Sequence, residues 1–397
     1  MSEWKKVKLG DCCLKIGSGS TPKGGSTVYV ESGTSFIRSQ NVYNLSFDYN
    51  GLTHITEDAA NKLNGVTIFN DDILLNITGD SVARTCIVPN DVLPARVNQH
   101  VAIVRADCKM INSRFLNYYL ASPGMQAHML SLAVGKGASR NAMTKQMIEN
   151  FEVPCPSLST QQRIATTLSR YDSLIENYQK QIKLLEEAAQ RLYKEWFVDL
   201  HFPGHENTKI VDGVPEGWEK KAIGDIVVYY DKQRKPLSSM QRMNMEKIYP
   251  YYGAAALMDY VDNYLFDGIY LLLGEDGTVI TPDKFPVLQY VWGKFWVNNH
   301  AHVLRGKEGI STEFLYSMFK EMPIADIVTG AAQPKISQGR LSEKKILIPS
   351  LKLIQKWSSI AKHFFDRLRV LSEQVRLLTE ARDRLLPKLM SGEIEIS

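Results

Sequence analysis

The stretch from Ile164 to Trp196, IATTLSRYDSLIENYQKQIKLLEEAAQRLYKEW, decides much of the fold. Apolar or large residues recur along it in alternating steps of four and three, an average of about 3.5 residues that keeps one side of a helix facing a partner helix. The predicted seam consists of Ile164, Leu168, Tyr171, Ile175, Tyr178, Ile182, Leu185, Ala189, Leu192 and Trp196. Ser159-Thr160-Gln161-Gln162 matches a capping box, so we expect one long helix that begins near residue 159.

A second seam with the same spacing lies near the end of the sequence. Its members are Ile354, Trp357, Ala361, Phe364, Leu368, Leu371, Val375, Leu378, Arg382, Leu385 and Leu389. Pro387 should end or kink this helix, and Gly392 suits its end. Two such apolar seams in one chain can pack against each other. The short link at residues 201–217 favours antiparallel helices, because in a parallel pair it would have to run back along the whole first helix. We therefore expect an intramolecular antiparallel coiled coil with pseudo-twofold symmetry.

The segments that precede the two helices are copies of one another. WKKVKLGD at residues 4–11 matches WEKKAIGD at residues 218–225, and VNQHVAIVR at 97–105 matches VNNHAHVLR at 297–305. Pro156-Ser157-Leu158 then matches Pro349-Ser350-Leu351, and these two segments are fewer residues apart than the first matched pair, so the second copy is the shorter one. A repeat this long indicates a duplicated domain rather than an array of short units. The two copies share a framework and differ in their loops.

Short apolar runs bounded by Gly, Asn, Asp and Pro indicate strands in both copies, and residues 113–120 and 312–319 indicate helices. The predicted strands are residues 66–69, 73–77, 101–104, 269–273, 290–292 and 301–304. We predict an α+β protein with two globular domains, each of mixed α/β structure with a twisted sheet and each followed by a long helix. The expected boundaries are 1–158 and 218–350 for the domains, 159–200 for the central helix, 201–217 for the linker and 351–397 for the distal helix and tail.

The composition is that of an ordinary globular protein, with 44% hydrophobic and 23% charged residues and a net charge of +4. No apolar run approaches the roughly 18 residues of a membrane span, and the first residues lack the apolar core of a signal peptide, so we expect a cytoplasmic protein. The five cysteines form no C-x-x-C motif and predict neither a disulfide framework nor a structural zinc site.

Sequence signatures of catalysis are missing. There is no G-x-x-x-x-G-K-[ST] motif, and the absence of any Pro-Pro pair excludes the [ND]-P-P-[FYW] loop of an amino-methyltransferase. His300-Ala301-His302 would place two imidazoles on one face of a strand, but we interpret them as packing residues. Glu275-Asp276-Gly277 is interpreted as a turn. We therefore predict no catalytic site and no metal site.

Basic and amide side chains gather in loops of both copies. Lysine and arginine supply phosphate contacts, and amides, hydroxyls and arginine read base edges. The candidates for DNA binding are Lys23, Arg38, Gln40, Asn41, Arg84, Lys136, Arg140 and Asn141 in the first copy and Lys232, Arg234, Lys235, Arg242 and Lys247 in the second. A solvated surface loop is the alternative interpretation of each segment. Two different readers on a rigid spacer suit a duplex with two unequal half-sites at a fixed separation.

Several segments resemble the specificity (S) subunit of type I restriction-modification enzymes, and the resemblance spans essentially the whole chain. They are LYKEWFVD at 192–199, VPEGW at 214–218, DKQRKPLS at 231–238, YPYYG at 249–253, WVNNHAH at 296–302 and RLLPKLMSGEI at 384–394. The resemblance implies that each domain reads one half of a bipartite, asymmetric DNA site. It also implies that the coiled coil sets the spacer and that the subunit has no catalytic activity of its own.

The partners are implied by the resemblance as well. Two modification (M) methyltransferase subunits would dock on this chain, and restriction (R) subunits with translocase and nuclease activity would complete the enzyme. S-adenosylmethionine, ATP and Mg are expected in those partner subunits and no cofactor in this one. Two alternatives remain open: a bivalent coiled-coil scaffold for protein partners without DNA readout, and a catalytic methyltransferase or nuclease. Steep salt dependence would favour DNA binding over the scaffold, and binding of S-adenosylmethionine by the isolated chain would favour the enzyme.

Overall fold

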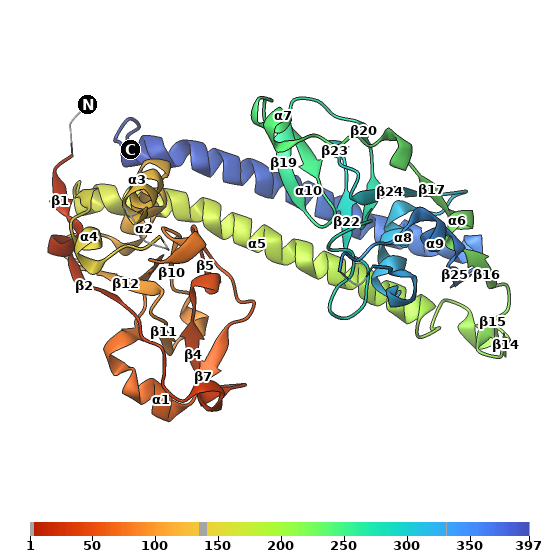
Figure 1. Ribbon diagram of the computed structural model, residues 1–397, viewed down its shortest axis with the longest axis horizontal. Coiled ribbons are helices and arrows are strands. Elements are labelled where there is room, and N and C mark those ends of the chain that lie inside the picture. Colours follow the sequence, from red (N-terminus) through yellow and green to blue (C-terminus); the bar gives the residue numbers. More distant parts are fainter. Residues whose placement is uncertain (1–3, 135–140, 331, 397) are drawn as a thin grey trace. The chain divides into compact units, whose positions relative to one another are not determined.

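A computed structural model describes residues 4–134, 141–330 and 332–396. The chain divides into two compact units whose elements are labelled in Figure 1. Unit 1 comprises Met1–Asn177 and Gln374–Ser397, and unit 2 comprises Tyr178–Glu373. The long helices α5 (Leu158–Phe197) and α10 (Leu351–Met390) each contribute one part to each unit. Unit 1 therefore combines two segments that lie far apart in the sequence, whereas unit 2 is continuous.

Unit 1 contains two main sheets. The four-stranded sheet is antiparallel, with the order β10-β9-β12-β2, and the five-stranded sheet has the order β3-β7-β4-β11-β8, in which β4 and β11 are parallel. The strands are β1 (Lys6–Lys8), β2 (Cys13–Ser18), β3 (Tyr29–Val30), β4 (Thr34–Ile37), β5 (Val42–Tyr43), β6 (Ser46–Phe47), β7 (Thr53–Ile55), β8 (Thr67–Ile68), β9 (Ile73–Asn76), β10 (Thr85–Ile87), β11 (Ala95–Val97), β12 (Val101–Ala106) and β13 (Glu152–Pro154). The shorter helices are α1 (Glu57–Lys62), α2 (Ser113–Ala121), α3 (Pro123–Ala133) and α4 (Lys145–Glu149).

Unit 2 also has two main sheets. Their orders are β17-β24-β21-β22, which is antiparallel, and β19-β18-β23-β20, in which β18 and β23 are parallel. The strands are β14 (Ile210–Val211), β15 (Val214–Pro215), β16 (Glu219–Ala222), β17 (Val227–Tyr229), β18 (Tyr249–Tyr252), β19 (Leu257–Val261), β20 (Phe266–Asp267), β21 (Tyr270–Gly274), β22 (Leu288–Val291), β23 (Lys294–Val297), β24 (Ala301–Gly306) and β25 (Lys345–Ile348). The shorter helices are α6 (Ile223–Ile226), α7 (Ser239–Met243), α8 (Thr312–Lys320) and α9 (Gln338–Glu343).

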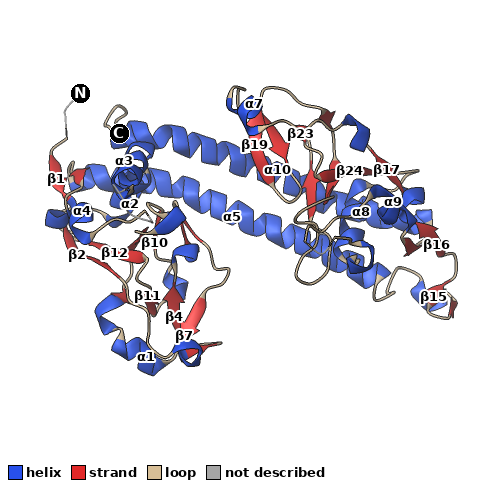
Figure 2. Ribbon diagram, viewed as in Figure 1, coloured by secondary structure: helices blue, strands red, loops and turns tan. Residues whose placement is uncertain are grey.

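The two units share one topology. The sheet β10-β9-β12-β2 corresponds strand by strand to β22-β21-β24-β17, and the parallel pair β4–β11 corresponds to β18–β23. Helix α8 stands in the place of α2, and both carry a Phe-Leu pair in their first turns. Figure 2 shows helices and strands mixed within each unit, as expected for the α+β class. The duplication predicted from the sequence is therefore present in the fold.

The central strands bury both faces of the four-stranded sheets. In β9, Ile73 and Leu75 join the core that contains residues of α2, α5 and α10, whereas Leu74 joins the core between the two sheets. In β21, Leu271 and Leu273 face the helices and Leu272 faces the second sheet. Successive side chains of a strand point to opposite faces. A strand covered on both sides is therefore apolar throughout, as these two runs are.

Helices α5 and α10 pack antiparallel within each unit. In unit 1, Ile164 near the start of α5 shares a core with Leu386 and Leu389 near the end of α10. In unit 2, Tyr193 near the end of α5 makes an edge-to-face contact with Trp357 near the start of α10, with ring centroids 5.8 Å apart. The antiparallel direction expected from the short linker is confirmed inside both units.

The predicted seam covers part of the buried surface of the two helices. Its buried members are Ile164, Leu168, Ile175, Ala189, Trp196, Ile354, Trp357, Ala361, Leu368, Leu371 and Leu389, and its half-buried members are Tyr171, Tyr178, Ile182, Leu185, Leu192, Phe364, Val375, Leu378, Arg382 and Leu385. Tyr193, Phe197, Phe365 and Leu386 lie outside the seam and are buried too. Each helix packs against a globular core as well as its partner, so its buried stripe is wider than a coiled-coil seam.

The helix ends differ from the sequence prediction in two details. The capping side chain of α5 is Ser157 and not Ser159, since Ser157 Oγ accepts a hydrogen bond from the Thr160 backbone N–H at 3.2 Å. Helix α10 does not end at Pro387, one of the two outcomes expected there, but continues to Met390, because buried Leu386 and Leu389 anchor its last turn in the core of unit 1. Gly392 follows with a φ of 72°, in the left-handed region that suits glycine at a helix end.

Replacing Trp357 with Ala should destabilise unit 2. The Trp357 side chain is fully buried among Tyr193, Phe197 and Phe314, so its loss leaves a cavity worth about 3–5 kcal/mol. Ile360→Ala, on the same helix at 39% exposure, is the control and should change the unfolding free energy by less than about 0.5 kcal/mol. Urea unfolding measures both variants, and equal midpoints would contradict the assigned core.

Candidate nucleic-acid interface

In unit 1, the predicted residues near Arg38 shape a loop against the turn that contains Gly51. Asn41 is fully buried; its Oδ1 accepts a hydrogen bond from the Arg38 backbone N–H at 3.0 Å, and its Nδ2 donates to the Asp48 carbonyl oxygen at 2.9 Å. Arg38 Nη2 donates to the Gly51 carbonyl oxygen at 2.7 Å, and the exposed Gln40 donates to the same oxygen at 3.3 Å. Asn41 and Arg38 therefore fix the backbone of this loop by hydrogen bonds. The Gln40 side chain makes one such bond and is exposed to solvent.

The other predicted residues of unit 1 are spread over separate loops. The half-buried Arg84 places its guanidinium 4.5 Å from the centre of the exposed Tyr43 ring. Lys23 is exposed in the loop after β2, and Asn141 is half-buried, with its carbonyl oxygen bound to the Gly79 backbone N–H at 2.9 Å. The predicted Lys136 and Arg140 lie outside the described residues.

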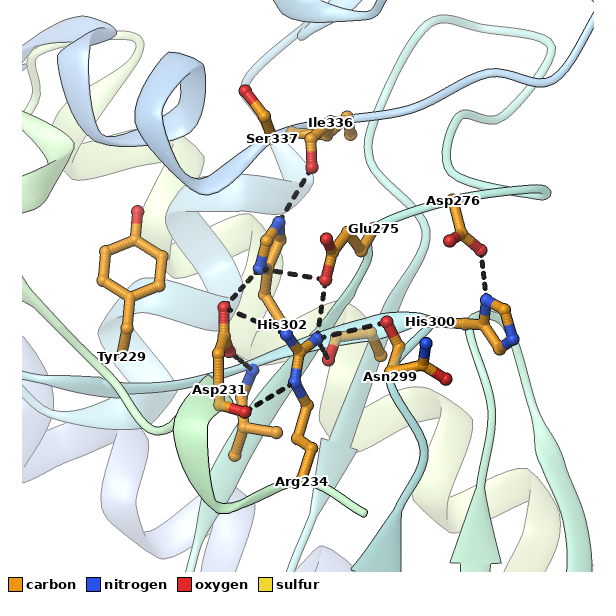
Figure 3. A network of polar contacts seen from close by, with 12 residues as sticks. Tyr229, Asp231, Arg234, Glu275, Asp276, Asn299, His300, His302, Ile336 and Ser337 are labelled. Carbon is orange, nitrogen blue, oxygen red and sulfur yellow. Dashed lines mark hydrogen bonds and ion pairs between the residues drawn. The ribbon is translucent and has the colours of Figure 1, made fainter. Parts of the chain in front are cut away.

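In unit 2, Arg234 belongs to a network of ion pairs and hydrogen bonds (Figure 3). Its Nη1 atom donates to Glu275 Oε2 at 2.6 Å and to the Ala301 carbonyl oxygen at 2.6 Å, and its Nε atom donates to the Asp231 carbonyl oxygen at 3.0 Å. The side chain is only 12% exposed. Arg234 therefore ties the segment 231–237 to the ends of β21 and β24.

His302 lies on the other side of the same network. Its side chain is 1% exposed, with Nδ1 at 2.6 Å from Asp231 Oδ2 and Nε2 at 2.8 Å from the Ile336 carbonyl oxygen. Asp231 Oδ1 also accepts from the Val303 backbone N–H at 2.9 Å. His300, in contrast, is exposed and contacts Asp276. The two imidazoles that alternate along the sequence thus occupy different environments.

Asp231, Glu275 and His302 also have the donor types of a metal site. Their ligand atoms lie within 4.8 Å of one another, a spacing compatible with a bound metal ion. All three are engaged, because His302 bonds to Asp231 and the Arg234 guanidinium bonds to Glu275. Arg234 supplies the positive charge that a metal ion would otherwise bring. The donor set therefore fits an internal ion-pair network better than a metal centre.

The segment around Lys232 and Lys235 is anchored through its backbone. Trp296 Nε1 donates to the Lys235 carbonyl oxygen at 2.6 Å, and the Leu237 backbone N–H donates to Tyr251 Oη at 3.0 Å. The side chains of Lys232 and Lys235 are exposed and form no ion pair with any residue that the structure describes. A fixed backbone with free ammonium groups is suited to phosphate contacts.

Arg242 and Lys247 share one carboxylate, that of Asp259. Arg242 Nε lies 3.1 Å and Lys247 Nζ 2.9 Å from its oxygens, and Arg242 also packs 4.8 Å from the centre of the Tyr251 ring. Hydrogen bonds from Lys247, from the Tyr260 backbone N–H and from Arg242 lower the pKa of Asp259 to about 2. Both cations thus stabilise the loop that carries them.

Sequence reasoning missed two features of these surfaces. Glu275, interpreted as part of a turn, is also the acidic partner of Arg234, and no local pattern connects residues 41 positions apart. Large apolar side chains at the surface were missed as well: Tyr43, Tyr49 and Phe69 in unit 1 and Met240, Met243 and Met258 in unit 2 are 40–78% exposed. The signal available for the second group was its concentration of methionines beside the predicted basic residues.

Comparison with known proteins places the chain in a family. A model of the family described as "Type I restriction modification DNA specificity domain" matches residues 1–187 and 215–376. The chain belongs to this family. The type I restriction enzyme MjaIX specificity subunit of Methanocaldococcus jannaschii is 25% identical over 99% of this chain and 94% of its own length. The EcoprrI specificity subunit of Escherichia coli is 22% identical over 79% of this chain and 77% of its own length.

A solved structure supports the fold. The crystal structure of a type I restriction-modification S subunit from M. genitalium matches with a TM-score of 0.60 and 17% identity, over 97% of this chain and 96% of that one. As a type I specificity subunit, the chain is a DNA-recognition component of a restriction-modification system and not a catalytic one. Among its described helices, none is both long enough and apolar enough to span a membrane.

Replacing Arg234 with Ala should destabilise unit 2 of the specificity subunit. The side chains of Asp231 and Glu275 are 8% and 16% exposed. Without the guanidinium, Asp231 keeps His302 at 2.6 Å, whereas Glu275 keeps the more distant His302 and Lys335, both at 3.7 Å. We expect a cost of about 1.5–3 kcal/mol, the contribution of a hydrogen bond to a charged group. Lys235→Ala, at an exposed neighbour, should change the unfolding free energy by less than about 0.5 kcal/mol. Urea unfolding measures both variants. An equal decrease in unfolding free energy for Arg234→Ala and Lys235→Ala would show that the Arg234 network does not stabilise unit 2.

The Asp259 ion pairs should persist to low pH. Because the pKa of Asp259 falls from 3.8 to about 2 on folding, its stabilising contribution is fully present above pH 3.8 and is lost as the pH falls through about 2. The difference in Tm between the natural chain and Asp259→Asn should therefore be constant above pH 4 and shrink toward pH 2. Asp262→Asn, at an exposed carboxylate after the same strand, is the control. A difference that vanishes already at pH 4 would contradict the pairing.

Proposed function

We propose that the chain reads a bipartite, asymmetric DNA site, with residues 1–158 and 218–350 as its two target-recognition domains. One observation carries the proposal: the same sheet topology occurs twice, while the loops between the strands differ. A repeated framework lets each domain approach a duplex in an equivalent way. Different loops then select different bases, so the two half-sites are unequal.

The two long helices are proposed to set the spacer between the half-sites. The central helix at 159–200, the linker at 201–217 and the distal helix at 351–397 form the part that joins the two domains. Antiparallel packing within both units supports this arrangement. Rigid helices suit a ligand whose two sites lie at a fixed separation along a duplex.

The candidate DNA-binding residues divide by their surroundings into two proposed roles. Lys23, Gln40, Arg84, Asn141, Lys232 and Lys235, together with Lys136 and Arg140 from the segment outside the described residues, are proposed to contact DNA. Arg38, Asn41, Arg234, Arg242 and Lys247 are proposed to hold the loops that present them, because their polar groups already bind protein atoms. Gln40 also donates to a carbonyl oxygen, at 3.3 Å, but its side chain is exposed, so it stays in the first group. Phosphate contacts would give affinity, and the amides would read base edges.

The proposed assembly contains two modification (M) methyltransferase subunits docked on this chain, with restriction (R) subunits completing the nuclease in the cytoplasm. S-adenosylmethionine would be bound by the M subunits, and ATP and Mg by the partner subunits. A duplicated chain offers two equivalent docking surfaces, which supports the ratio of two M subunits to one S subunit. A saturated complex with one M subunit for each S subunit would contradict that ratio.

Methylome sequencing tests the proposed function. A host that expresses this chain together with its candidate M subunit should acquire N6-methyladenine at a split motif of two unequal half-sites around a fixed gap. The same host with the M subunit alone is the control and should show no such motif. A stable complex that methylates no motif would contradict DNA readout and favour the protein scaffold. Salt provides a second criterion, because DNA affinity through several phosphates falls steeply with ionic strength.

A further inference from the structure

Helix α7 lies in the connection between β17 and β18 of unit 2, which also carries the predicted basic residues, and it exposes two methionines. Met240 is 77% and Met243 is 78% exposed, and Met258 on the neighbouring strand β19 is 55% exposed. Figure 1 shows α7 beside β19, and the ion pair between Arg242 and Asp259 joins the two elements. Water-exposed clusters of large apolar side chains typically mark an interaction site. Met258 accepts a hydrogen bond from Asn298 at its sulfur, at 3.5 Å, whereas Met240 and Met243 lie three positions apart on α7 and so are neighbours on its surface. We call Met240 and Met243 the methionine patch.

The backbone that carries this patch is fixed. Ser238 Oγ accepts from the Gln241 backbone N–H at 3.2 Å, and Gln241 Oε1 accepts from the Ser238 backbone N–H at 2.8 Å, which closes a capping box on α7. Arg242 then bridges the Leu237 carbonyl oxygen and Asp259. The methionine side chains can adopt many rotamers, whereas the backbone atoms that carry them are held in place. A recognition element needs this combination, because only the side chains have to be ordered on binding.

The surroundings of the patch favour an anionic partner. The segment from residue 232 to 260 contains more basic than acidic side chains. Its acidic residues are Glu246 and Asp259, and its basic residues include Lys232, Lys235, Arg242 and Lys247. Two of these cations, Lys232 and Lys235, are exposed and free of ion pairs within the described part of the chain. DNA offers both kinds of surface that this loop requires: phosphates for the ammonium groups, and base faces and thymine methyl groups for the apolar side chains.

We infer that α7 is a base-contacting element, in which Met240 and Met243 make apolar contact with the bases of the half-site read by unit 2. The methionines contact either thymine methyl groups or the faces of an opened base step. Methionine is one of the residues that DNA-binding proteins insert between base pairs. Lys232 and Lys235 bind the flanking phosphates. This inference rests on the proposed function and specifies how one half-site is discriminated.

Among the residues of unit 1 that the structure describes, there is no counterpart of this element. Its matching connection, from β2 to β4, contains no methionine, and the structure places a 3-10 turn and the short strand β3 there instead of an α-helix. The apolar contact should therefore act on one half-site only. That asymmetry makes the inference testable inside a single complex, with the other half-site as an internal reference.

The test uses the full chain bound to its M subunit and a duplex that carries the motif found by methylome sequencing. The double variant Met240→Ala/Met243→Ala should bind this duplex about tenfold or more weakly, the size of one lost base contact. The dependence of affinity on salt should stay unchanged, because no phosphate contact is lost. The methylome of a host with this variant should show relaxed base choice in one half-site and the natural choice in the other.

Two variants serve as comparisons. Lys235→Ala should lower the salt dependence of binding and leave the methylated motif unchanged, as expected for a phosphate contact. Met110→Ala removes a methionine that is 39% exposed in unit 1, and should change neither affinity nor motif. Equal Tm values for all variants and the natural chain show that the effects are not losses of folding.

Modified duplexes separate the two kinds of apolar contact. Replacing the thymines of the affected half-site by uracil should weaken binding of the natural chain and not of the double variant, if the methionines contact methyl groups. If they enter a base step, 2-aminopurine placed there should become more fluorescent with the natural chain and not with the double variant. Either result supports base contact by α7.

Other outcomes overturn the inference. A double variant with natural affinity and an unchanged motif would show that the patch does not contact bases. A variant that loses its M subunit while the motif is retained would assign the patch to protein docking. If the natural chain itself directs no split motif, the proposed function fails as a whole, whereas a natural motif unaffected by the methionines removes only the inference about α7.

Discussion

Burial of the four-stranded sheets on both faces is the constraint on which the rest of this structure depends. One face packs against α2 or α8 and the long helices, and the other packs against the second sheet. Strands covered in this way have no surface left for a ligand. The side chains available to a ligand therefore lie in the loops and at the strand ends, where the two copies of the domain differ. The same constraint explains how a duplicated framework can keep its fold while its surfaces diverge.

The charged residues of one loop serve two physical purposes. Arg234 points inward, because a planar guanidinium can bond to a carboxylate and to backbone carbonyl oxygens at once. Lys232 and Lys235 carry compact ammonium groups on flexible stems and stay in water. The internal network fixes the backbone from which the lysines extend. Loss of the arginine should therefore disturb the loop, whereas loss of a lysine should remove a single contact.

Much of the fold could be predicted from the sequence, and the site only in part. The predicted strands at 73–77 and 301–304 appear as β9 and β24, and the predicted helices at 113–120 and 312–319 appear as α2 and α8. These segments have strong local periodicity. The heptad spacing pointed to Phe364 and Leu385, whereas Phe365 and Leu386 are the more buried neighbours. A helix that touches both a partner helix and a globular core follows a wider stripe than a heptad describes.

By itself the sequence determined the duplicated domain, the two long helices and their antiparallel pairing, because these follow from repeats, from periodicity and from the length of a linker. The tertiary structure decided which of the predicted cations are held in internal ion pairs. Glu275 meets Arg234, and His302 meets Asp231, only after strands distant in the sequence have paired. Asp259 on β19 likewise reaches Arg242 and Lys247, which precede β18. Charge pairing depends on distances in space, and a linear sequence does not contain those distances.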